Sequence, residues 1–520
     1  MSTVDDLDPT TPVLVGVGQS AERVDDAAYA RMSAVDLAAE AARRAVTDAG
    51  LPASAIDTVA GVRQFEISTP WAQAPLGRSD NFPRAVAGRL GAGPARAVLE
   101  VAGGQGPQHL VNEFAGVIAA GGAEVVLLVG SEAISTTRAL ARADDRPDYT
   151  ERVGGQMEDR GYGLEGLISR YAEQHGLVSA PGQYALFENA RRARLGMTRD
   201  AYARAMGELF APFTTVAAAN PYAAAPVERD AAELATVTTR NRKIADPYTR
   251  FLVARDQVNQ GAAVLLTSVG AARRLGVPRD RWVFLHGHAD LRERDLLDRT
   301  DLSTSPASVR AVTLALSVAG RSVDDLATID LYSCFPIAVF NICDGLGLAP
   351  DDPRGLTLTG GLPFFGGAGN NYSMHAIAET ADRLRAAPGT FGLVGANGGL
   401  LSKYSVGVYA TTPAPWRPDG SAAVQREIDE GPIIDHVLRA DGAAAIETFT
   451  IIYGRDGDRT GIVVGRLAGD GRRFLATNVP GDDDLLALLE SEQPIGARVH
   501  VRATEAGNRV TVGPVSAGSR

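Results

Sequence analysis

Cysteine is almost absent from this sequence. The 520 residues contain Cys334 and Cys343, and none occurs in the first 333 positions. We predict both in one helix, where a spacing of nine residues places them more than two turns apart. This is too far for a disulfide bond or a shared cysteine metal site. So few thiols fit a reducing compartment, and we expect the protein to be cytoplasmic.

Long apolar runs and an excess of basic residues are also missing. The first ten residues, MSTVDDLDPT, are acidic and lack the apolar core of a signal peptide. No apolar run approaches the ~20 residues that cross a bilayer. The formal net charge of −11 argues against a nucleic-acid partner, whose binding depends on clustered lysine and arginine. His286 and His288 lack a carboxylate or cysteine at ligand spacing, so we expect no metal site.

The chain does contain a strand, a glycine-rich turn, a helix and a second strand between Ala95 and Gly130. The turn, GGQGP, places unpaired backbone N–H groups and the positive end of a helix dipole at one point. Many enzymes hold a nucleophile or an anion at such a point. Here the residue is Gln105, followed by Gly106, and glutamine is not a nucleophile.

Strands and helices alternate along two similar halves of the chain. AVTDAGLPASAID near Gly50 is echoed by LALSVAGRSVDDLATID near Gly320, which indicates duplication of a whole βαβ-type half. We expect largely parallel sheets covered by helices. The predicted first half comprises residues 1–130 and 257–272, and the predicted second half comprises residues 273–412.

Between the two parts of the first half, charged and tyrosine-containing segments replace the buried strands. We interpret residues 131–256 as a large insertion that folds on its own over the sheet, as a lid or substrate-binding region. Its basic run includes Arg240, Arg242 and Lys243, which could meet a phosphate of a ligand. A solvated surface is the favoured alternative for this run.

The C-terminal part has a different pattern. Residues 413–426 resemble a linker, and residues 427–520 contain about six short strands separated by turns such as GRDGD and AGDGR. This predicts a small antiparallel β-barrel of the OB type. The strands lack the interleaved aromatic and basic residues of a single-strand nucleic-acid binder.

Several phrases, in the right order, resemble thiolases of the sterol-carrier type and their thiolase-like relatives. They include GGAEVVLLVGSEAIS, RKIADPYTRF, NQGAAVLLTS, DLYSCF and GLVGANGG, and the resemblance extends over about residues 10–412. It implies the thiolase fold, with duplicated βαβαβαββ halves in αβαβα layers. It also implies CoA or acyl-CoA as a ligand, with no tightly bound cofactor. The C-terminal barrel is not part of the thiolase pattern.

The same resemblance implies that four thiolase positions are changed. Gln105 occupies the position of the nucleophilic cysteine, and Gly367 that of the activating histidine. Ala396 replaces the second cysteine, and Tyr332 replaces an asparagine or histidine of the oxyanion hole. A covalent acyl-enzyme on cysteine therefore cannot form in the first half, and we expect no ordinary thiolase activity.

Other polar residues lie in the same loops. Tyr332, Tyr372 and His375 are candidate catalytic residues, and the candidate pocket residues are Gln105, Gly106, Asn370, Asn371, Asn397 and Gly398. The alternative is that these groups merely fill the space vacated by histidine and cysteine. For Cys334, a packing role is favoured over a catalytic one.

Three functions remain open. The first is binding of acyl-CoA without thiolysis. The second is a retro-aldol reaction or another carbon–carbon bond reaction on an acyl-CoA, with Tyr332 or Tyr372 as the base and the fused barrel in place of a separate OB-fold partner. The third is residual acyltransferase activity in lipid metabolism. The family resemblance implies a dimer, but the extra barrel could occlude the dimer contact, which leaves a monomer open.

Overall fold

The computed structural model describes residues 6–164 and 169–513. The acidic start of the chain and the last residues of the predicted barrel fall partly outside these ranges. The first half forms a sheet that β5 of the insertion extends to six strands, in the order β1-β8-β4-β2-β3-β5. Its strands are β1 (Pro12–Ala21), β2 (Thr58–Gly61), β3 (Arg96–Leu99), β4 (Val125–Ala133), β5 (Glu158–Asp159) and β8 (Asn259–Ser268). The pairs β1–β8 and β8–β4 are antiparallel and the others are parallel, so the sheet is mixed and not largely parallel as predicted.

The second half contributes a four-stranded sheet of order β10-β11-β12-β9. Its strands are β9 (Phe284–Arg292), β10 (Leu326–Leu331), β11 (Phe391–Gly398) and β12 (Lys403–Ala410). Only β10 and β11 are parallel within it. The segment with Leu358 and Thr359 folds back as a loop, because the buried Asp330 carboxylate of β10 accepts the backbone N–H groups of both residues. The second half thus has four strands where the repeated motif of the first half has five.

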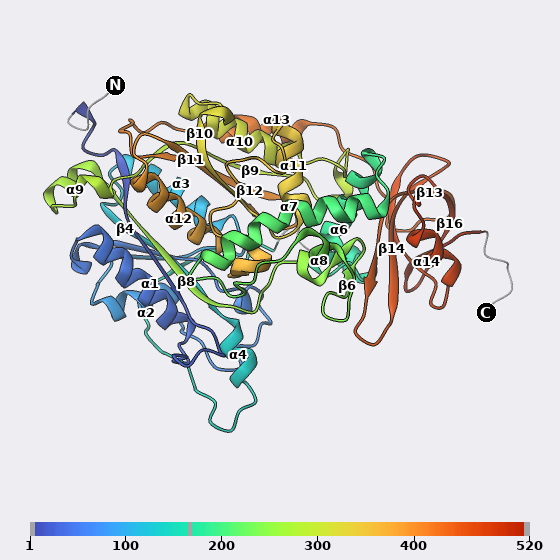
Figure 1. Ribbon diagram of the computed structural model, residues 1–520, viewed down its shortest axis with the longest axis horizontal. Helices are drawn as coiled ribbons and strands as arrows, with labels where there is room; N and C mark the ends of the chain where they lie inside the picture. The colour runs from blue at the N-terminus through green and yellow to red at the C-terminus, as the bar shows by residue number, and fades with distance from the viewer. Residues whose placement is uncertain (1–5, 165–168, 514–520) are drawn as a thin grey trace.

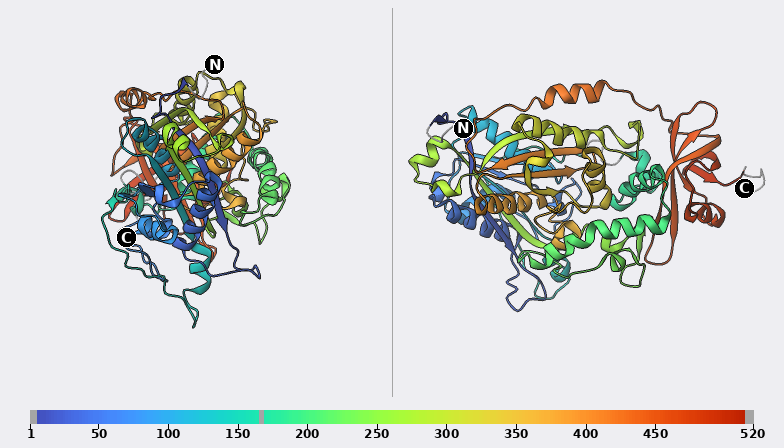
Figure 2. Two further views of the ribbon diagram at one scale, coloured as in Figure 1. Left: turned by 90° about the vertical axis from the view of Figure 1, so that its left-hand side faces the viewer. Right: turned by 45° about the horizontal axis from the view of Figure 1, so that its top comes forward.

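Helices form layers on and between the two sheets (Figures 1 and 2). The outer layers include α1 (Ala34–Ala49) and α2 (Phe82–Leu90) on the first sheet and α10 (Pro306–Ala319) and α11 (Pro336–Leu346) on the second. The central layer consists of α3 (Gly106–Ala119) and α12 (Tyr372–Ala386), whose apolar side chains pack with strands of both sheets. This arrangement confirms the predicted thiolase-type layers.

Local signals define several helix ends as predicted. Ser33 and Asp36 form a capping box at the start of α1, and Gly50 ends this helix in the left-handed conformation. The predicted helix around the two cysteines is shorter than expected. It begins at Pro336, since proline suits the first helical turn, and Cys334 therefore precedes it.

The insertion, predicted to fold on its own, shares sheets and an apolar cluster with the rest of the chain. It contributes α4 (Ile134–Leu140), α5 (Arg170–Gln174), α6 (Ala180–Arg194), α7 (Arg199–Ala219), α8 (Ala231–Ala235), β6 (Lys243–Ala245) and β7 (Tyr248–Thr249). Its β5 extends the first sheet, and Ala245 of β6 pairs with Ile452 of the C-terminal barrel. The buried faces of α6 and α7 share one apolar cluster with the second half. The insertion therefore links the thiolase-type core to the barrel.

The C-terminal barrel closes through five strands in the order β14-β15-β17-β16-β13, with β14 paired back to β13. They are β13 (Gly442–Tyr453), β14 (Arg459–Leu467), β15 (Arg473–Asn478), β16 (Arg498–Thr504) and β17 (Gly507–Thr511), with α14 (Asp483–Glu490) between β15 and β16. The pair β15–β17 is parallel, so the barrel is not wholly antiparallel. The predicted barrel is confirmed, with five strands where about six were expected.

Part of the predicted linker is a helix. The helix α13 (Ser421–Glu430) packs against the edge strand β9. It lies in the orange connection that leads to the barrel (Figure 2). Ser421 Oγ accepts the N–H of Asp290, and the Gln425 amide bonds both backbone groups of Arg292. His286 Nε2 and His288 Nε2 lie 2.7 Å and 3.1 Å from the carbonyl oxygens of Thr412 and Arg417. Both histidines thus bind this segment.

Within the described residues, no helix is both long and apolar enough to cross a membrane.

Candidate functional site

Gln105 lies at the start of α3, in the position predicted for it. Its side chain is 7% exposed and packs against Gly103 and Gly398, where an added Cβ would overlap its amide. Its Oε1 has no hydrogen-bond partner among the described residues. A buried amide therefore stands where the helix N-terminus offers its N–H groups, and Gly106 begins the helix beside it.

Hydrogen bonds connect the turn before Gln105 to the loop before α12 and to the start of that helix. The Asn370 side chain accepts the N–H of Gly103 at 2.9 Å and donates to the carbonyl of Arg63 at 2.8 Å. Ser373 Oγ donates to the carbonyl of Gly104 at 2.7 Å. Asn370 therefore positions the turn, and both of its amide groups are used in doing so.

Asn371 and Asn397 retain unpartnered polar atoms within the described part of the chain. Both side-chain atoms of Asn371 are buried without a partner, close to Gly130. Asn397, next to Gly398 in β11, donates to the Tyr184 hydroxyl at 3.0 Å, while its Oδ1 has no partner. Buried polar groups in proteins are almost always hydrogen-bonded, so these atoms indicate room for water or a ligand group.

Tyr332 and Tyr372 lie together, as the sequence predicted. Their rings meet edge to face, with centroids 5.4 Å apart. The Tyr372 hydroxyl lies 2.5 Å from Thr359 Oγ1, and that of Tyr332 lies against Gly104. Burial raises the pKa of each phenol well above its usual value. Both side chains are therefore neutral hydrogen-bonding groups, which argues against either of them as a base.

His375 is fully buried in the first turn of α12. Its Nδ1 lies 2.7 Å from Gln19 Oε1, and the Gln19 amide in turn donates to Glu379 at 3.0 Å. Burial lowers the pKa of His375 to about 3. The imidazole is therefore neutral, with its Nε2 unpartnered among the described residues.

Gly367 and Ala396, the other two residues predicted at thiolase positions, carry no functional side chain. Gly367 donates its N–H to the Arg255 carbonyl at 2.7 Å, at the end of a single buried turn, Leu362–Gly366. Ala396 is buried in β11. The insertion covers the same turn, because the backbone N–H groups of Ala224 and Ala225 donate to the carbonyls of Phe365 and Phe364. The histidine position is thus covered by backbone.

Cys334 lies near the site without the properties of a nucleophile. Asn397 Nδ2 lies 3.8 Å from its sulfur. Burial raises the pKa of the Cys334 thiol to about 12, so a thiolate is not formed near neutral pH. The packing role expected for Cys334 agrees with this geometry.

Glu188 supports the site and was not predicted from the sequence. This fully buried carboxylate of α6 accepts the Tyr248 hydroxyl at 2.7 Å, the Tyr202 hydroxyl at 2.5 Å and the N–H of Ile337 at 2.8 Å. Burial raises its pKa to about 7, against these hydrogen bonds. Glu188 thereby caps α11 and fixes the loop that carries Tyr332.

The predicted basic run lies at the barrel and not at Gln105. Arg242 donates to the carbonyl of Tyr453, and the Lys243 ammonium lies 5.2 Å from the centre of the Tyr453 ring. Arg240 is exposed next to them. The structure therefore places Arg242 and Lys243 at the contact between insertion and barrel.

A cavity of ≈ 730 Å³ reaches Gln105 from the side of α13. Its wall is formed by the end of β3, the first turns of α3, the ends of β9 and β12, and α13. The residues that line it include Glu100, Gln105, His109, Asp290, Lys403, Ser405, Ser421 and Gln425. None of these except Gln105 was a predicted site residue.

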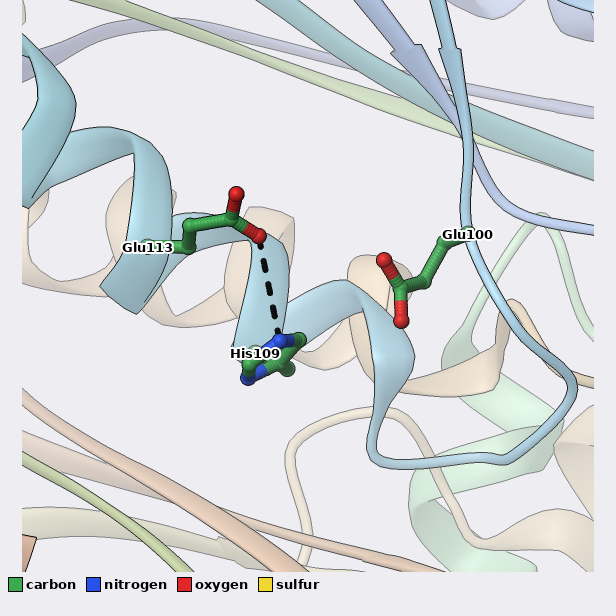
Figure 3. Close-up of side chains that lie close together, drawn as sticks. All are labelled: Glu100, His109 and Glu113. Carbon is green, nitrogen blue, oxygen red and sulfur yellow. Dashed lines mark ion pairs between the residues drawn. The ribbon is translucent and has the colours of Figure 1, made fainter. Parts of the chain in front are cut away.

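Glu100, His109 and Glu113 converge beside this cavity from the end of β3 and from α3 (Figure 3). Their ligand atoms lie close enough together to hold a metal ion. However, the Arg160 guanidinium lies 2.6 Å from carboxylate oxygens of both glutamates. His109 Nδ1 lies 3.1 Å from Asp290 Oδ1. The group is therefore an ion-pair network in this structure.

Comparisons of the fold identify the class of protein. The human mitochondrial 3-ketoacyl-CoA thiolase is 16% identical and superposes with a TM-score of 0.54, over 77% of this chain and 99% of that one. The Ltp2-ChsH2(DUF35) aldolase is 20% identical with a TM-score of 0.57, over 77% and 98% of the two chains. The chain has the thiolase fold.

A nearer relative identifies the family. The structure of a monomeric SCP2-thiolase like protein type 1 from Mycobacterium smegmatis is 52% identical, with a TM-score of 0.84, over 98% of this chain and all of that one. Residues 423–506 match the family model of the thiolase-like protein type 1 additional C-terminal domain. The chain therefore belongs to the SCP2-thiolase-like proteins of type 1. A search of the curated proteins found no match to the sequence.

Proposed function

We propose that this protein binds CoA or acyl-CoA and does not form an acyl-enzyme. The observation that carries the proposal is the buried Gln105 amide, packed against Gly103 and Gly398 at the start of α3. An amide cannot attack a thioester, and the nearby Cys334 thiol is held protonated by burial. The positive end of the α3 dipole still lies there for a thioester oxygen, although the N–H of Gly106 is bonded to the Gly103 carbonyl and Pro107 has none.

Calorimetric titration with CoA and with butyryl-CoA tests this proposal. We expect saturable binding of both ligands, and competition between them. Intact-mass measurement after incubation with acetyl-CoA is expected to show no acetyl adduct. Absence of binding would contradict the first part of the proposal, and thiolysis of acetoacetyl-CoA at an enzymic rate would contradict the second.

Cleavage of a β-hydroxyacyl-CoA by a retro-aldol reaction is the second candidate. The fused barrel favours it, because β13 of the barrel pairs with the insertion and Asn189 of α6 donates to the carbonyl of Phe449 at 3.0 Å. The neutral phenols of Tyr332 and Tyr372 suit donation to an enolate oxygen, but neither suits removal of the hydroxyl proton. This candidate ranks second because neither tyrosine predicted as the base suits removal of that proton. Release of a ketone or aldehyde from such thioesters would place it first.

We infer that the protein is a monomer that works without a tightly bound cofactor, in the cytoplasm. The edge of β3 is covered within the chain by β5, through parallel pairing. Arg96 and Arg63 hold Glu158 and Asp159 of this strand by ion pairs. The relative from M. smegmatis, described as monomeric, has the same family membership. Sedimentation velocity tests the oligomeric state, and a dimer at micromolar concentration would contradict it.

A further inference from the structure

Another cavity lies where three parts of the chain meet. It has a volume of ≈ 230 Å³, and residues of the insertion, of the second half and of the barrel line it. Six leucines form the apolar part of its wall: Leu177, Leu296, Leu297, Leu400, Leu438 and Leu475. The volume is below the ~300–1,000 Å³ of cavities that take drug-sized ligands, so this cavity suits a small molecule with an apolar body.

Arg299 adds a buried cation to this wall. The residue is 5% exposed, and it lines the cavity beside the leucines. Its Nε donates to the carbonyl of Arg294 at 2.8 Å, and its Nη2 donates to the carbonyl of Leu400 at 3.1 Å. The third nitrogen, Nη1, is buried and has no hydrogen-bond partner among the described residues. A guanidinium is always charged, so donor capacity of a buried cation is unused here.

The Arg299 guanidinium is fixed in its orientation by its neighbours. Its central carbon lies 4.8 Å from the centre of the Phe187 ring, and the two carbonyls hold Nε and Nη2. Arg473, which is itself buried, donates to the carbonyls of Leu297 and Arg299 at 2.6 Å and 2.7 Å. The turn that carries Arg299 is therefore ordered, and a ligand would meet a donor that needs no rearrangement.

The acidic side chains of the wall do not pair with Arg299. Asp298 Oδ1 lies 3.2 Å from His436 Nδ1, and Asp295 is exposed, where water and salt screen its charge. Neither carboxylate forms an ion pair with Arg299. A buried charge without a charged partner is costly, so Arg299 favours an anionic group in this cavity.

We propose that this cavity binds a free short-chain monocarboxylate, whose carboxylate accepts a hydrogen bond from Arg299 Nη1 and whose alkyl chain packs against the leucines. Hydrogen bonds between a guanidinium and a carboxylate are about twice as strong as those between neutral groups. A neutral carbonyl oxygen could accept the same hydrogen bond, but it would leave the charge of Arg299 unpaired. The site is independent of the proposed function, since its ligand is neither CoA nor a thioester.

Calorimetric titration with hexanoate and with hexanamide tests the proposal, because the two probes have equal chain length and differ in charge. We expect saturable binding of hexanoate at one site, at least tenfold tighter than that of hexanamide. Saturating hexanoate should also raise the melting temperature, since the ligand binds the folded state alone. Arg299→Gln removes the cation and is expected to abolish the preference for hexanoate.

A second pair of variants tests the site without altering a buried residue. Leu438 lines the cavity and is 61% exposed, so Leu438→Asp adds a negative charge at the cavity while the core stays intact. We expect it to weaken hexanoate binding at least fivefold. Ile433→Asp is the matched control, because Ile433 is 52% exposed and lies outside the lining. It adds the same charge and is expected to change the affinity less than twofold.

Absence of saturable hexanoate binding would overturn the inference. Equal or tighter binding of hexanamide would overturn it as well, because the occupant would then be a neutral molecule. An unchanged preference in a folded Arg299→Gln variant would show that hexanoate binds elsewhere. If Arg299→Gln does not fold, the other pair of variants decides, and equal effects of Leu438→Asp and Ile433→Asp would contradict binding in this cavity.

Discussion

The hydroxyl of Tyr332 lies against the α-carbon of Gly104, so the turn before Gln105 has no room for a side chain. A Cβ at Gly104 would come 2.5 Å from Tyr332 Cζ and 2.6 Å from the Asn397 carbonyl oxygen. Tyr332 therefore packs directly onto the turn that carries Gln105, and both residues were predicted to stand at altered thiolase positions. The two replacements form one packed unit.

Gly104→Ala is therefore expected to destabilise the protein by about 1–3 kcal/mol, since backbone at Asn397 cannot move aside. Urea unfolding measures the change. Gly93→Ala is the control, because a Cβ there meets no heavy atom within 4 Å, and its effect is expected to stay within about 0.5 kcal/mol. Equal effects of the two substitutions would contradict the packing of Tyr332 onto the turn.

Both cysteines are expected to resist alkylation in the folded protein. Burial raises the pKa of Cys334 and of Cys343 to about 12, and iodoacetamide attacks thiolates. Native protein at pH 8 should therefore gain no carbamidomethyl group over an hour, by intact mass, and two after denaturation. Gln105→Cys supplies a thiol at a helix N-terminus as a positive control. Fast modification of Cys334 in the native wild type would refute the proposal that this thiol is inert.

The free energy of unfolding is expected to decrease at alkaline pH because His109 loses its proton. Burial opposes its charge, but Asp290, Glu100 and Glu113 raise the pKa of His109 to about 9, even with Arg160 nearby. The folded pKa lies above the unfolded value of about 6.5, so this stabilisation is complete below pH 6.5 and is lost as the pH rises through 9.

The side chain is 36% exposed, so solvent screening limits the loss to about 1 kcal/mol. The measurement is the free energy of unfolding of the wild type and of His109→Gln at pH 6.5 and 9.5. The wild type should lose more stability than the variant over this range. Parallel pH profiles would show that the charge of His109 does not stabilise the fold.

Removal of Arg160 is expected to be costly. Its guanidinium pairs with Glu100, whose side chain is 4% exposed, and with Glu113. Arg160→Ala leaves a buried carboxylate uncompensated and should cost about 3–5 kcal/mol. It should also loosen β5 from the edge of β3. Arg138→Ala removes an exposed pair with Asp256 and should cost less than about 1 kcal/mol. Similar melting temperatures of the two variants would contradict a buried role for Arg160.

Features with local signals were predictable from the sequence. The start and end of α1 follow from Ser33, Asp36 and Gly50, and the start of α3 follows from the glycine-rich turn. The order of family-like phrases predicted the thiolase-type layers, and the short strands separated by turn sequences predicted the barrel. Tyr332 and Tyr372 were expected in one pocket, and their rings are in contact.

Features that depend on distant partners were not predictable. β6 is three residues long, and its pairing with β13 joins parts of the chain with no local signal in common. His109 and Asp290 meet across 181 positions of sequence, and neither stands in a thiolase motif. The segment predicted as a linker becomes α13 from Ser421 onward because its side chains bond the edge of β9.

The pairing of β6 with β13 also sets an order of events during synthesis. The insertion leaves the ribosome with β6 and α6 complete, but Phe449 and Thr448 lie 260 and 262 residues beyond Asn189 and Leu186, the α6 residues that they bond. Until then Asn189 and the free edge of β6 lack their final partners. Nascent chains halted before residue 442 should therefore be more susceptible to protease in the insertion than the finished protein.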